Sequence, residues 1–459
     1  MAHAMNMKIE SSASSIGADV TPSVLVMGMG VTGASCARYF AAQGVGAQFV
    51  DSRAEPPCTA DILDAMPDAR MHPGSELTTL PETIRKIVIS PGVDLNSSLI
   101  RTGRDRGVEI VSDIDLFVAE CKSPIIAVTG SNGKSTVTAM LGVALPTAGC
   151  SAAIGGNLGT PALDLLHQGK DVYVLELSSF QLERSAPVPA AAATVLNISP
   201  DHLDMHGDMQ AYTTAKALIY SDCRHAIVNR DVPELMALVP ETTVVTTFGL
   251  GDPAVGEFGL RKTQRGECLV FGESLLLSAD ELPVRGRHNL ANALAALALG
   301  AVIGADIHAM AQALKRYRGL PHRMQVVADA DGVVWIDDSK ATNVAAAAAS
   351  IAGVADPFIL IAGGDGKGAS FEALAAVLTG RQCAAILLGR DARQIADVLE
   401  PVCDLEIVPD MAAAVAAAHA RAGPGYTVLL APACSSLDMF DSYVERGEVF
   451  AAVLQELTR

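Results

Sequence analysis

Short runs of β-branched and other apolar residues alternate with alanine-rich stretches along almost the whole chain. This order is typical of α/β domains, in which helices pack on the faces of largely parallel sheets. Half of the residues are hydrophobic but only 4% are aromatic, a composition that suits such packing. With 459 residues, the chain is long enough for about two to four domains, each with its own core.

Breaks in the alternation predict three α/β domains after a disordered N-terminus at residues 1–22. Residues 23–112 are expected to form a small Rossmann-like domain. Residues 113–319 are expected to form a central domain of the P-loop ATPase type, which ends at a Gly/Pro break. Residues 320–459 are expected to form a doubly wound, Rossmann-like domain. In such sheets, ligand-binding side chains gather at the carboxyl ends of the strands.

Charge, cysteine usage and hydropathy limit the partners and the cellular location that the sequence predicts. The net charge of −18 gives the chain no electrostatic footprint for nucleic acid or for an anionic membrane. Nine scattered cysteines without a CxxC pair predict reduced thiols in a cytoplasmic protein. The first 21 residues do not have the pattern of a secretory signal. The longest apolar stretch, residues 293–305, is too short to span a bilayer.

A glycine loop follows one of the apolar runs, between a predicted strand at residues 125–128 and a predicted helix from Ser135. Glycines let successive backbone N–H groups point at phosphate oxygens, and the helix N-terminus adds positive potential. Lys134 is then expected to bridge two phosphates, and Ser135 to supply a hydroxyl to Mg²⁺. The predicted loop residues are Gly130, Ser131, Asn132, Gly133, Lys134, Ser135 and Thr136.

The spacing of this loop is the compressed form G-x-x-G-K-S. The first glycine of the common form G-x-x-x-x-G-K-[ST] would fall at Val128. A plain strand-to-helix turn with a surface lysine is therefore an alternative interpretation. The polar residues further along the chain favour the phosphate site.

Three downstream residues suit such a site, although each also has a plainer explanation. Glu176 follows a predicted strand, where a carboxylate could bind Mg²⁺, but it could simply begin a helix. His202 could be a metal ligand oriented by Asp201 or Asp204, or part of a polar turn. Lys216, in a helix predicted over residues 209–220, could take up CO₂ as a carbamate or remain a solvated lysine.

A second glycine loop, GMGVTG at residues 28–33, lies between the strand VLVM and a predicted helix at residues 34–43. Asp51, eighteen residues after Gly33, ends the next predicted strand. This spacing matches the dinucleotide fingerprint. Taken alone, the pattern favours NAD.

Taken together, the motifs of this chain resemble those of the Mur ligases of bacterial cell-wall synthesis, in the family's order. The strings are TGSNGKST (129–136), GNLG (156–159), ELSSFQL (176–182), NISPDHLD (197–204), GRHNLAN (286–292) and LPHR (320–323). They cover essentially the whole chain beyond its first twenty residues. The ordered set is far more specific than any one string.

The third predicted domain is similar to that of the D-glutamate-adding members of the family. It carries the strings DDSKATN (337–343), GGDGK (363–367) and PACSSLD (432–438). Other members carry Asp-Tyr-x-His strings where this chain has Asp338-Ser339-Lys340. The resemblance implies ATP-dependent ligation of D-glutamate to UDP-N-acetylmuramoyl-L-alanine through an acyl phosphate.

The resemblance also changes the interpretation of the first glycine loop. In this family, the same geometry holds the uridine diphosphate part of the substrate, and NAD becomes the minor alternative. The residues implied on this side are Val31, Thr32, Asp51, Ser52, Arg53, Ser90, Pro91 and Gly92, with Asn157 and His202 nearer the reacting end.

For ATP and metal, the resemblance implies two Mg²⁺ ions and a carbamate on Lys216. Ser135 and Glu176 are implied to hold one ion, and His202 and carbamylated Lys216 the other. The implied catalytic residues are Lys134, Asn157, His202 and Lys216. Further ATP contacts are implied at Asn289, Asn292, Arg323, Asp338 and Lys340, and D-glutamate contacts at Thr342, Lys367, Ser436, the backbone N–H of Leu437, and Tyr443.

Two rival functions stay open. A folylpolyglutamate-synthase-like ligase would share the ATP loop but should lack a Rossmann-like first domain. A non-enzymatic nucleotide-binding protein would not need Lys134, Glu176, His202 and Lys216 together. No feature of the sequence requires more than a monomer.

Overall fold

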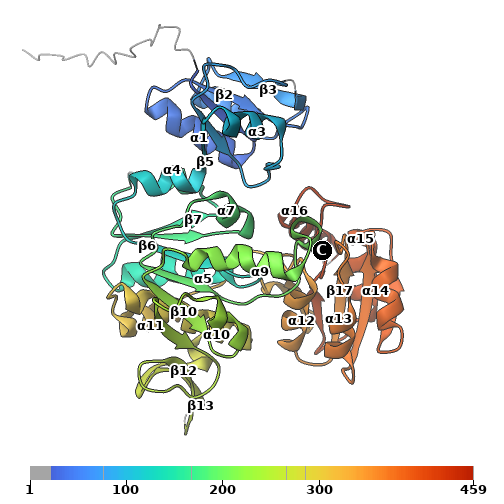
Figure 1. Cartoon of the computed structure of the whole chain (residues 1–459). Coiled ribbons are helices and arrows are strands. Elements are labelled where there is room, and N and C mark those ends of the chain that lie inside the picture. The colour runs from blue at the N-terminus through green and yellow to red at the C-terminus, as the bar shows by residue number, and fades with distance from the viewer. Residues whose placement is uncertain (1–21, 76, 167, 265, 285, 458–459) are drawn as a thin grey trace, which may run out of the picture. The chain divides into compact units, whose positions relative to one another are not determined.

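The computed structural model describes residues 22–457 except 76, 167, 265 and 285. The predicted disordered N-terminus lies outside these residues, apart from Pro22. The chain divides into two compact units, which meet in the sequence at Asp113 and Ile114. The first unit contains one sheet, and the second contains two (Figure 1).

The first unit is built on a five-stranded parallel sheet with the strand order β3-β2-β1-β4-β5. Leu25 and Met27 of β1 contribute to its core together with Ile87 and Ile89 of β4. The strands are β1 Val24–Met27, β2 Ala47–Val50, β3 Arg70–His72, β4 Lys86–Ile89 and β5 Glu109–Ser112, and the helices are α1 Val31–Ala42, α2 Thr59–Ala65 and α3 Ser98–Asp105.

A nine-stranded sheet forms the core of the central region, with the order β14-β13-β12-β11-β10-β9-β6-β8-β7. Strands β6 to β11 run parallel, while β12, β13 and β14 form antiparallel pairs at one edge. The strands are β6 Ile125–Thr129, β7 Ala152–Gly156, β8 Val172–Glu176, β9 Ala192–Val195, β10 His225–Asn229, β11 Val244–Phe248, β12 Phe258–Thr263, β13 Gly266–Phe271 and β14 Ser274–Ser278.

Helices α5 and α10 pack against each other in the core of this region. The alanines of α10 leave room for close approach, and most residues of both helices are buried. Residues 293–300 of the apolar stretch at 293–305 are buried in this core. Within the described part of the chain, every helix is too short or too polar to cross a membrane. The helices are α4 Asp113–Glu120, α5 Lys134–Thr147, α6 Ala162–Leu165, α7 Ser179–Arg184, α8 Leu203–His206, α9 Met209–Ala217, α10 Arg287–Val302 and α11 Ile307–Leu314.

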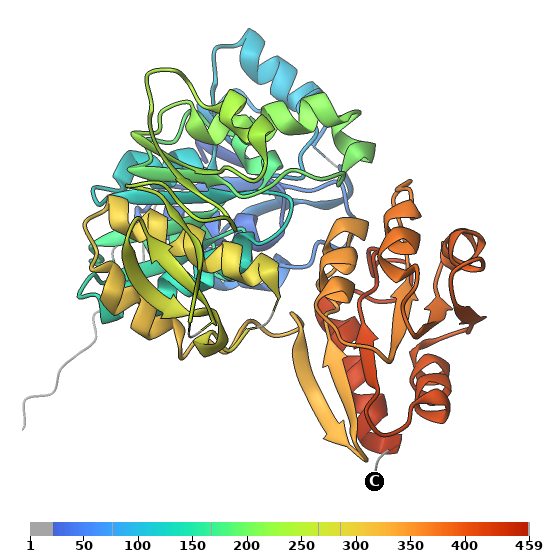
Figure 2. The same cartoon turned by 90° about the horizontal axis from the view of Figure 1, so that it is seen from below.

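The C-terminal region has a six-stranded sheet with the order β15-β16-β20-β17-β18-β19, shown in orange to red in Figure 2. All pairs are parallel except the edge pair β15–β16. Alternate residues of β17 enter separate cores, Leu360 in one and Ile361 in the other, so both faces of the sheet are covered. The strands are β15 Gln325–Ala330, β16 Val333–Asp337, β17 Phe358–Gly363, β18 Cys383–Leu388, β19 Asp404–Ile407 and β20 Thr427–Leu430, and the helices are α12 Val344–Ala352, α13 Glu372–Leu378, α14 Ala392–Leu399, α15 Met411–Arg421 and α16 Tyr443–Leu457.

The predicted three-part α/β architecture is confirmed, and the expected strands agree with those observed to within one or two residues. Two differences from the predictions concern the central and C-terminal regions. Glu176 is the last residue of β8 rather than the first residue after it. The antiparallel strands β12, β13 and β14, and the antiparallel pair β15–β16, interrupt the expected βα alternation, because strands within each group connect through tight turns and need no crossover helix.

Candidate active site

The loop at residues 130–136 connects β6 to α5, as the sequence predicts. Gly130 and Gly133 have positive φ angles of 151° and 85°, conformations that glycine adopts readily. Gly133 is the N-cap of α5 and makes no side-chain capping bond. The first N–H groups of α5 and the positive end of its dipole are features that favour an anion at this position.

Two lysine side chains converge on one carbonyl group of this loop. Lys134 Nζ donates to Gly130 O at 2.7 Å and to Ser131 O at 3.0 Å. Lys216 Nζ, from α9, donates to the same Gly130 O at 3.0 Å. Burial lowers the pKa of Lys134 and lowers that of Lys216 well below its usual range, with a further decrease for Lys216 from Lys134. The site thus holds two buried amines beside the place where phosphates would bind.

Glu176 gives this region an incompletely paired carboxylate. It is 2% exposed, and its Oε1 accepts from Asn157 Nδ2 at 2.7 Å. Its Oε2 is buried and has no hydrogen-bond partner among the described residues. A buried, unsatisfied carboxylate oxygen is costly unless a cation or donor completes it. The Glu176 side chain therefore fits the role of a metal ligand.

Within residues 22–457, leaving out the four gaps, no three His, Cys, Asp or Glu side chains gather closely enough to hold a metal ion. Mg²⁺ is commonly bound by one or two protein oxygens together with substrate phosphates. Glu176 and the Ser135 hydroxyl fit that pattern. In this structure, Ser135 Oγ accepts from Arg323 Nη2 at 3.0 Å.

His202 has a positive φ of 54° and precedes α8. Its Nε2 lies 3.8 Å from Asp201 Oδ1, and the ring of Phe180 lies edge-on to it with the centroids 5.3 Å apart. Asp201 also accepts from Asn343 Nδ2 at 3.2 Å. The side chain of Asp204 lies outside the described part. Asp201 is thus the described carboxylate that faces His202.

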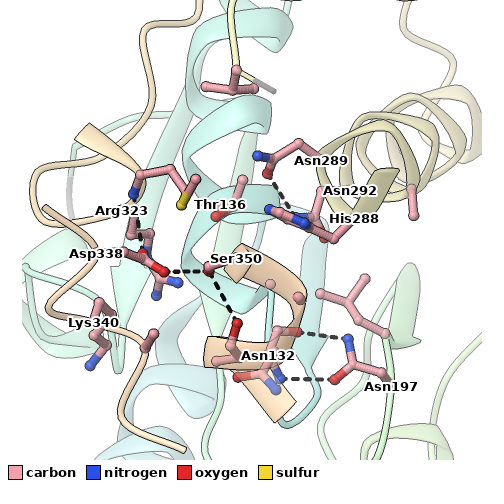
Figure 3. Close-up of a pocket in the computed structure, with 18 of the residues that line it drawn as sticks. Asn132, Thr136, Asn197, His288, Asn289, Asn292, Arg323, Asp338, Lys340 and Ser350 are labelled. Carbon is pink, nitrogen blue, oxygen red and sulfur yellow. Dashed lines mark hydrogen bonds between the residues drawn. The ribbon is translucent and has the colours of Figure 1, made fainter. Parts of the chain in front are cut away.

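A cavity of about 340 Å³ extends from the loop towards α10 and α12 (Figure 3). Asn289 and Asn292 line it and are linked by an amide hydrogen bond of 3.3 Å. Leu196, Phe248 and Val284 give it an apolar part. Binding sites for organic ligands usually combine such apolar walls with a few polar groups. The cavity suits the base and ribose of a nucleotide.

Arg323, Asp338 and Lys340 line the same cavity from the C-terminal region. Burial raises the pKa of the Asp338 carboxyl to about 7, although hydrogen bonds from Ser350 and from Met324 N act to lower it. Burial also lowers the pKa of Lys340 to about 8. Arg323 thus contacts the phosphate loop at Ser135, and Lys340 lines the same cavity.

A smaller cavity of about 40 Å³ lies next to His202. Thr342 and Lys367 line it together with Asp201 and Asn343. Lys367 has a positive φ of 53°, and its N–H donates to Asp365 Oδ1 at 3.0 Å. The structure thus brings two of the predicted amino-acid-binding side chains beside the predicted metal ligand.

The remaining predicted amino-acid-binding residues do not line this small cavity. Ser436 is buried, whereas Leu437 is 70% exposed and its N–H points to Ser435 Oγ at 3.5 Å. The ring of Tyr443 lies 3.9 Å from Lys340 Nζ and so belongs to the ATP side of the region.

In the first unit, the other glycine loop connects β1 to α1. Gly30 is the N-cap of α1 and has no side-chain cap, so the N–H groups near Val31 and Thr32 are open to an anion. Asp51 accepts from Met29 N at 2.7 Å and pairs with Arg53 at 2.6 Å. Mainly through the hydrogen bonds of the Arg53 side chain, the pKa of Asp51 falls to about 2.

The other residues predicted for the uridine side also belong to this end of the sheet. Ser52 is exposed beside Asp51, and Ser90, Pro91 and Gly92 follow β4. Ser90 Oγ is buried without a hydrogen-bond partner among the described residues. An unsatisfied hydroxyl at this place fits the edge of a binding site.

Two asparagines at the phosphate loop were not singled out from the sequence. Asn197 accepts from Asn132 N at 2.8 Å and donates to Asn132 O at 3.0 Å, which fixes the loop backbone. Asn343 exchanges amide hydrogen bonds with Asn132 at 3.2 and 3.4 Å. Asn197 follows a strand, and this position was the feature of the sequence that could have marked it as a site residue. Asn343 also caps α12 through Ala346 N, and capping alone would explain it.

Three family models match the chain in order. They are the N-terminal domain of the MurD-like Mur ligases at residues 22–112, the Mur ligase middle domain at 128–300, and the Mur ligase glutamate ligase domain at 322–434. Together they cover most of the chain. The chain therefore belongs to the Mur ligase family.

Two similar curated relatives are UDP-N-acetylmuramoylalanine–D-glutamate ligases. The protein from Methylococcus capsulatus is 44% identical over 442 residues, which are 96% of each chain. The protein from Nitrosococcus oceani is 45% identical over 441 residues, covering 95% of this chain and 97% of the relative. The solved UDP-N-acetylmuramate-alanine ligase from Thermotoga maritima matches 95% of this chain and 99% of its own, with a TM-score of 0.63. At 19% identity, that match supports the fold alone.

Proposed function

We propose that this protein is an ATP-dependent amide-bond-forming ligase. It joins D-glutamate to UDP-N-acetylmuramoyl-L-alanine through an acyl phosphate, with release of ADP and phosphate, in peptidoglycan precursor synthesis. The observation that carries the proposal is the convergence of Lys134, Lys216 and Glu176 at the phosphate loop, in a chain with all three Mur ligase domains. We retain residues 23–112, 113–319 and 320–459 as the proposed domains.

The phosphate loop, residues 130–136, would hold the ATP phosphates. Its backbone N–H groups and Lys134 supply positive potential, while the cavity beside Asn289 and Asn292 takes the base. Arg323 and Lys340 contact the nucleotide from the other side, and Asp338 fixes the backbone at Met324. This division explains why cations lie on both sides of the cavity.

Magnesium fits the oxygen atoms present at this site. Ser135 and Glu176 would hold one ion, and His202 with carbamylated Lys216 the other, and the ions would neutralise phosphate charge. The carbamate is supported by the position of Lys216, which is 1% exposed and lies against the phosphate loop. In its neutral form, the amine can add CO₂ and release a proton. The lysine side chain then carries the negative charge of a carbamate.

The chemistry requires two anions to approach each other, because the substrate carboxylate attacks a phosphate. Lys134 and the N–H groups of the loop lower this repulsion, and Asn157, which contacts Glu176, would orient the carboxylate. The D-glutamate amine then attacks the acyl phosphate. Lys367 and Thr342, with Ser436 and the N–H of Leu437, would bind the D-glutamate carboxylates, and Tyr443 would pack nearby.

In the first unit, the proposed ligand is the uridine diphosphate part of the substrate. The open N-terminus of α1 at Val31 and Thr32 would bind the pyrophosphate. Asp51, Ser52 and Arg53 would surround the uracil end, and Ser90, Pro91 and Gly92 would line the far side. The same loop geometry would accept any nucleotide pyrophosphate, so NAD is the alternative ligand.

We further propose that the protein acts as a cytoplasmic monomer. Its nine cysteines are free thiols, as expected in a reducing compartment. Gel filtration coupled to light scattering tests the oligomeric state directly. A dimer mass at working concentration would overturn the monomer.

One assay tests the reaction. The protein is given UDP-N-acetylmuramoyl-L-alanine and ATP–Mg²⁺, and phosphate release is measured with D-glutamate, with L-glutamate, and without an amino acid. We expect release that depends on both the nucleotide substrate and D-glutamate. Release that ignores D-glutamate would overturn the proposed reaction. A folylpolyglutamate-synthase-like enzyme would instead require a folate acceptor, and a non-enzymatic protein would release no phosphate.

A further inference from the structure

The first turns of α16 carry a buried arginine with an unusual set of partners. Arg446 is 2% exposed. Its Nε donates to Ser339 Oγ at 3.0 Å and its Nη2 to Ser339 O at 2.8 Å. Its Nη1 donates to Cys434 O at 3.2 Å. All three acceptors are neutral, and they belong to two different loops.

These two loops leave neighbouring strands of the C-terminal sheet. β16 and β20 pair in parallel, with Asp337 opposite Leu430. The loop after β16 carries Asp338 and Lys340 of the proposed ATP site. The loop after β20 carries the proposed D-glutamate contacts that follow Cys434. Arg446 therefore connects the nucleotide side to the amino-acid side directly above the carboxyl ends of the strands.

Two other residues of α16 press against the same region. The backbone O of Tyr443 accepts from Ser339 Oγ at 2.8 Å, and its ring contacts Lys340. A Cβ on Gly447 would lie 2.2 Å from His322 Nδ1 and 2.6 Å from Asp337 Oδ2. Only glycine fits there without displacing the hydrogen-bonded pair of His322 and Asp337, whose atoms are 2.7 Å apart.

A buried guanidinium is an expensive way to stabilise a fold. Burial lowers the pKa of Arg446 to about 10, so the group is still charged at neutral pH. Burying a charge carries a desolvation cost that a well-packed neutral side chain would avoid. In return, its planar fork fixes three acceptors in one geometry. That geometry is the property that a neutral side chain could not supply.

We propose that Arg446 is a positioning residue, which holds the loop of Asp338 and Lys340 and the loop of Cys434 to Leu437 in one arrangement. ATP and D-glutamate are thereby aligned with each other by a side chain that contacts neither. The inference rests on the proposed function for the identity of the two ligands. It makes α16 part of the binding apparatus.

The test compares full-length Arg446→Lys and Arg446→Met with a matched control, Arg421→Met. Arg421 is an exposed arginine of α15 paired with Glu406 at the surface. The KM for each of the three substrates, kcat and the melting temperature are measured. We expect Arg446→Met to raise the KM for D-glutamate and for ATP and to lower kcat/KM for D-glutamate by roughly 100-fold. The KM for the nucleotide sugar stays unchanged, Arg446→Lys recovers part of the loss, and the control resembles the unaltered protein.

A variant with a lower melting temperature but unchanged KM values for ATP and D-glutamate would overturn the proposal. If Arg446→Met does not fold, Gly447→Ala tests the same arrangement by displacing His322 and Asp337, with the same expected pattern. If the unaltered protein shows no D-glutamate-dependent reaction, the proposed function fails. ATP binding measured by calorimetry then decides the inference, because Arg446→Met must still weaken it.

Discussion

The two glycine loops of this protein, residues 28–33 and 130–136, occupy the same kind of place between a strand and a helix, but they differ in their surroundings. Each follows a buried parallel strand and leads into a long helix, α1 or α5. Each helix has a glycine N-cap without a side-chain capping bond. Both loops therefore present backbone N–H groups and a helix dipole to an anion.

The charged side chains around the loops differ in how they are neutralised. Beside the first loop, Asp51 and Arg53 neutralise each other in a bidentate pair. Beside the second, Lys134 and Lys216 both donate to the Gly130 carbonyl, and Glu176 has a buried carboxylate oxygen without a hydrogen-bond partner in the described part of the chain. Under the proposed function, the first loop would bind the nucleotide part of the substrate, and the second would stabilise the charge that develops during phosphate transfer. Substitutions at the first loop should alter substrate binding, and substitutions at the second loop should alter the turnover rate.

The largest effect is expected from Lys134→Ala. This change removes the ammonium group closest to the loop, so kcat should fall by roughly 10³-fold, as for other groups that stabilise transition-state charge. Phosphate release at saturating substrates is the measurement. Lys122→Ala, at an exposed lysine before the same strand, is the control and should be fully active. If Lys134→Ala changed KM alone, the second loop would affect binding rather than turnover, and the proposed difference between the two loops would be wrong.

Lys216→Ala should lower kcat by roughly 10²–10³-fold, because the anionic oxygens of the carbamate are lost. Acetate or formate should restore part of the activity by supplying a carboxylate in the space left by the side chain. The same salt added to Lys134→Ala is the control and should restore nothing. Full activity of Lys216→Ala without acetate would remove the carbamate from the mechanism.

The sequence was sufficient to predict most of this contrast, and the reason is physical. A phosphate-binding loop needs glycines at fixed spacing after a strand, and the second loop adds a lysine, so both loops and their strands could be located directly. The core strands β1, β6 and β8 are continuous apolar runs and were equally clear. The edge strand β3, Arg-Met-His, has no such run and was missed.

Local spacing and apolar runs do not show which distant segments come into contact. Lys216 meets Gly130 across 86 positions of sequence, and nothing near Lys216 distinguishes it from a solvated helix lysine. Its role was inferred only from the family resemblance. Arg446 lies outside the strings that carry the family resemblance. From the sequence alone, an arginine at this position would be expected on the surface. Both residues became visible only when burial and partners were known.

A smaller effect is expected at the first loop. Arg53→Ala removes an exposed cation from the proposed uracil end, so the KM for the nucleotide substrate should rise roughly 10-fold while kcat is unchanged. Initial rates at saturating ATP and D-glutamate give both constants. Arg101→Ala, at an exposed arginine of α3, should leave both unaltered. A fall in kcat would mean that the first loop also takes part in the chemistry.

The smallest effect concerns the stability that the Asp51–Arg53 pair gives to the first unit. Since the pKa of Asp51 is depressed to about 2 from its ordinary 3.8, the pair stabilises the fold above about pH 4, and this contribution is lost as the pH falls towards 2. Because the Arg53 side chain is 53% exposed, solvent screening limits the contribution to ~1–2 kcal/mol. Hydrogen exchange of the β1–β2 segment should therefore be about tenfold faster in Asp51→Asn than in the unaltered protein at pH 7, and only about twofold faster at pH 2, where Asp51 is half protonated. A difference that stayed at about tenfold at pH 2 would mean that the backbone bond from Met29, rather than charge, holds this loop. The contrast with the second loop would then rest on Lys134 and Lys216 alone.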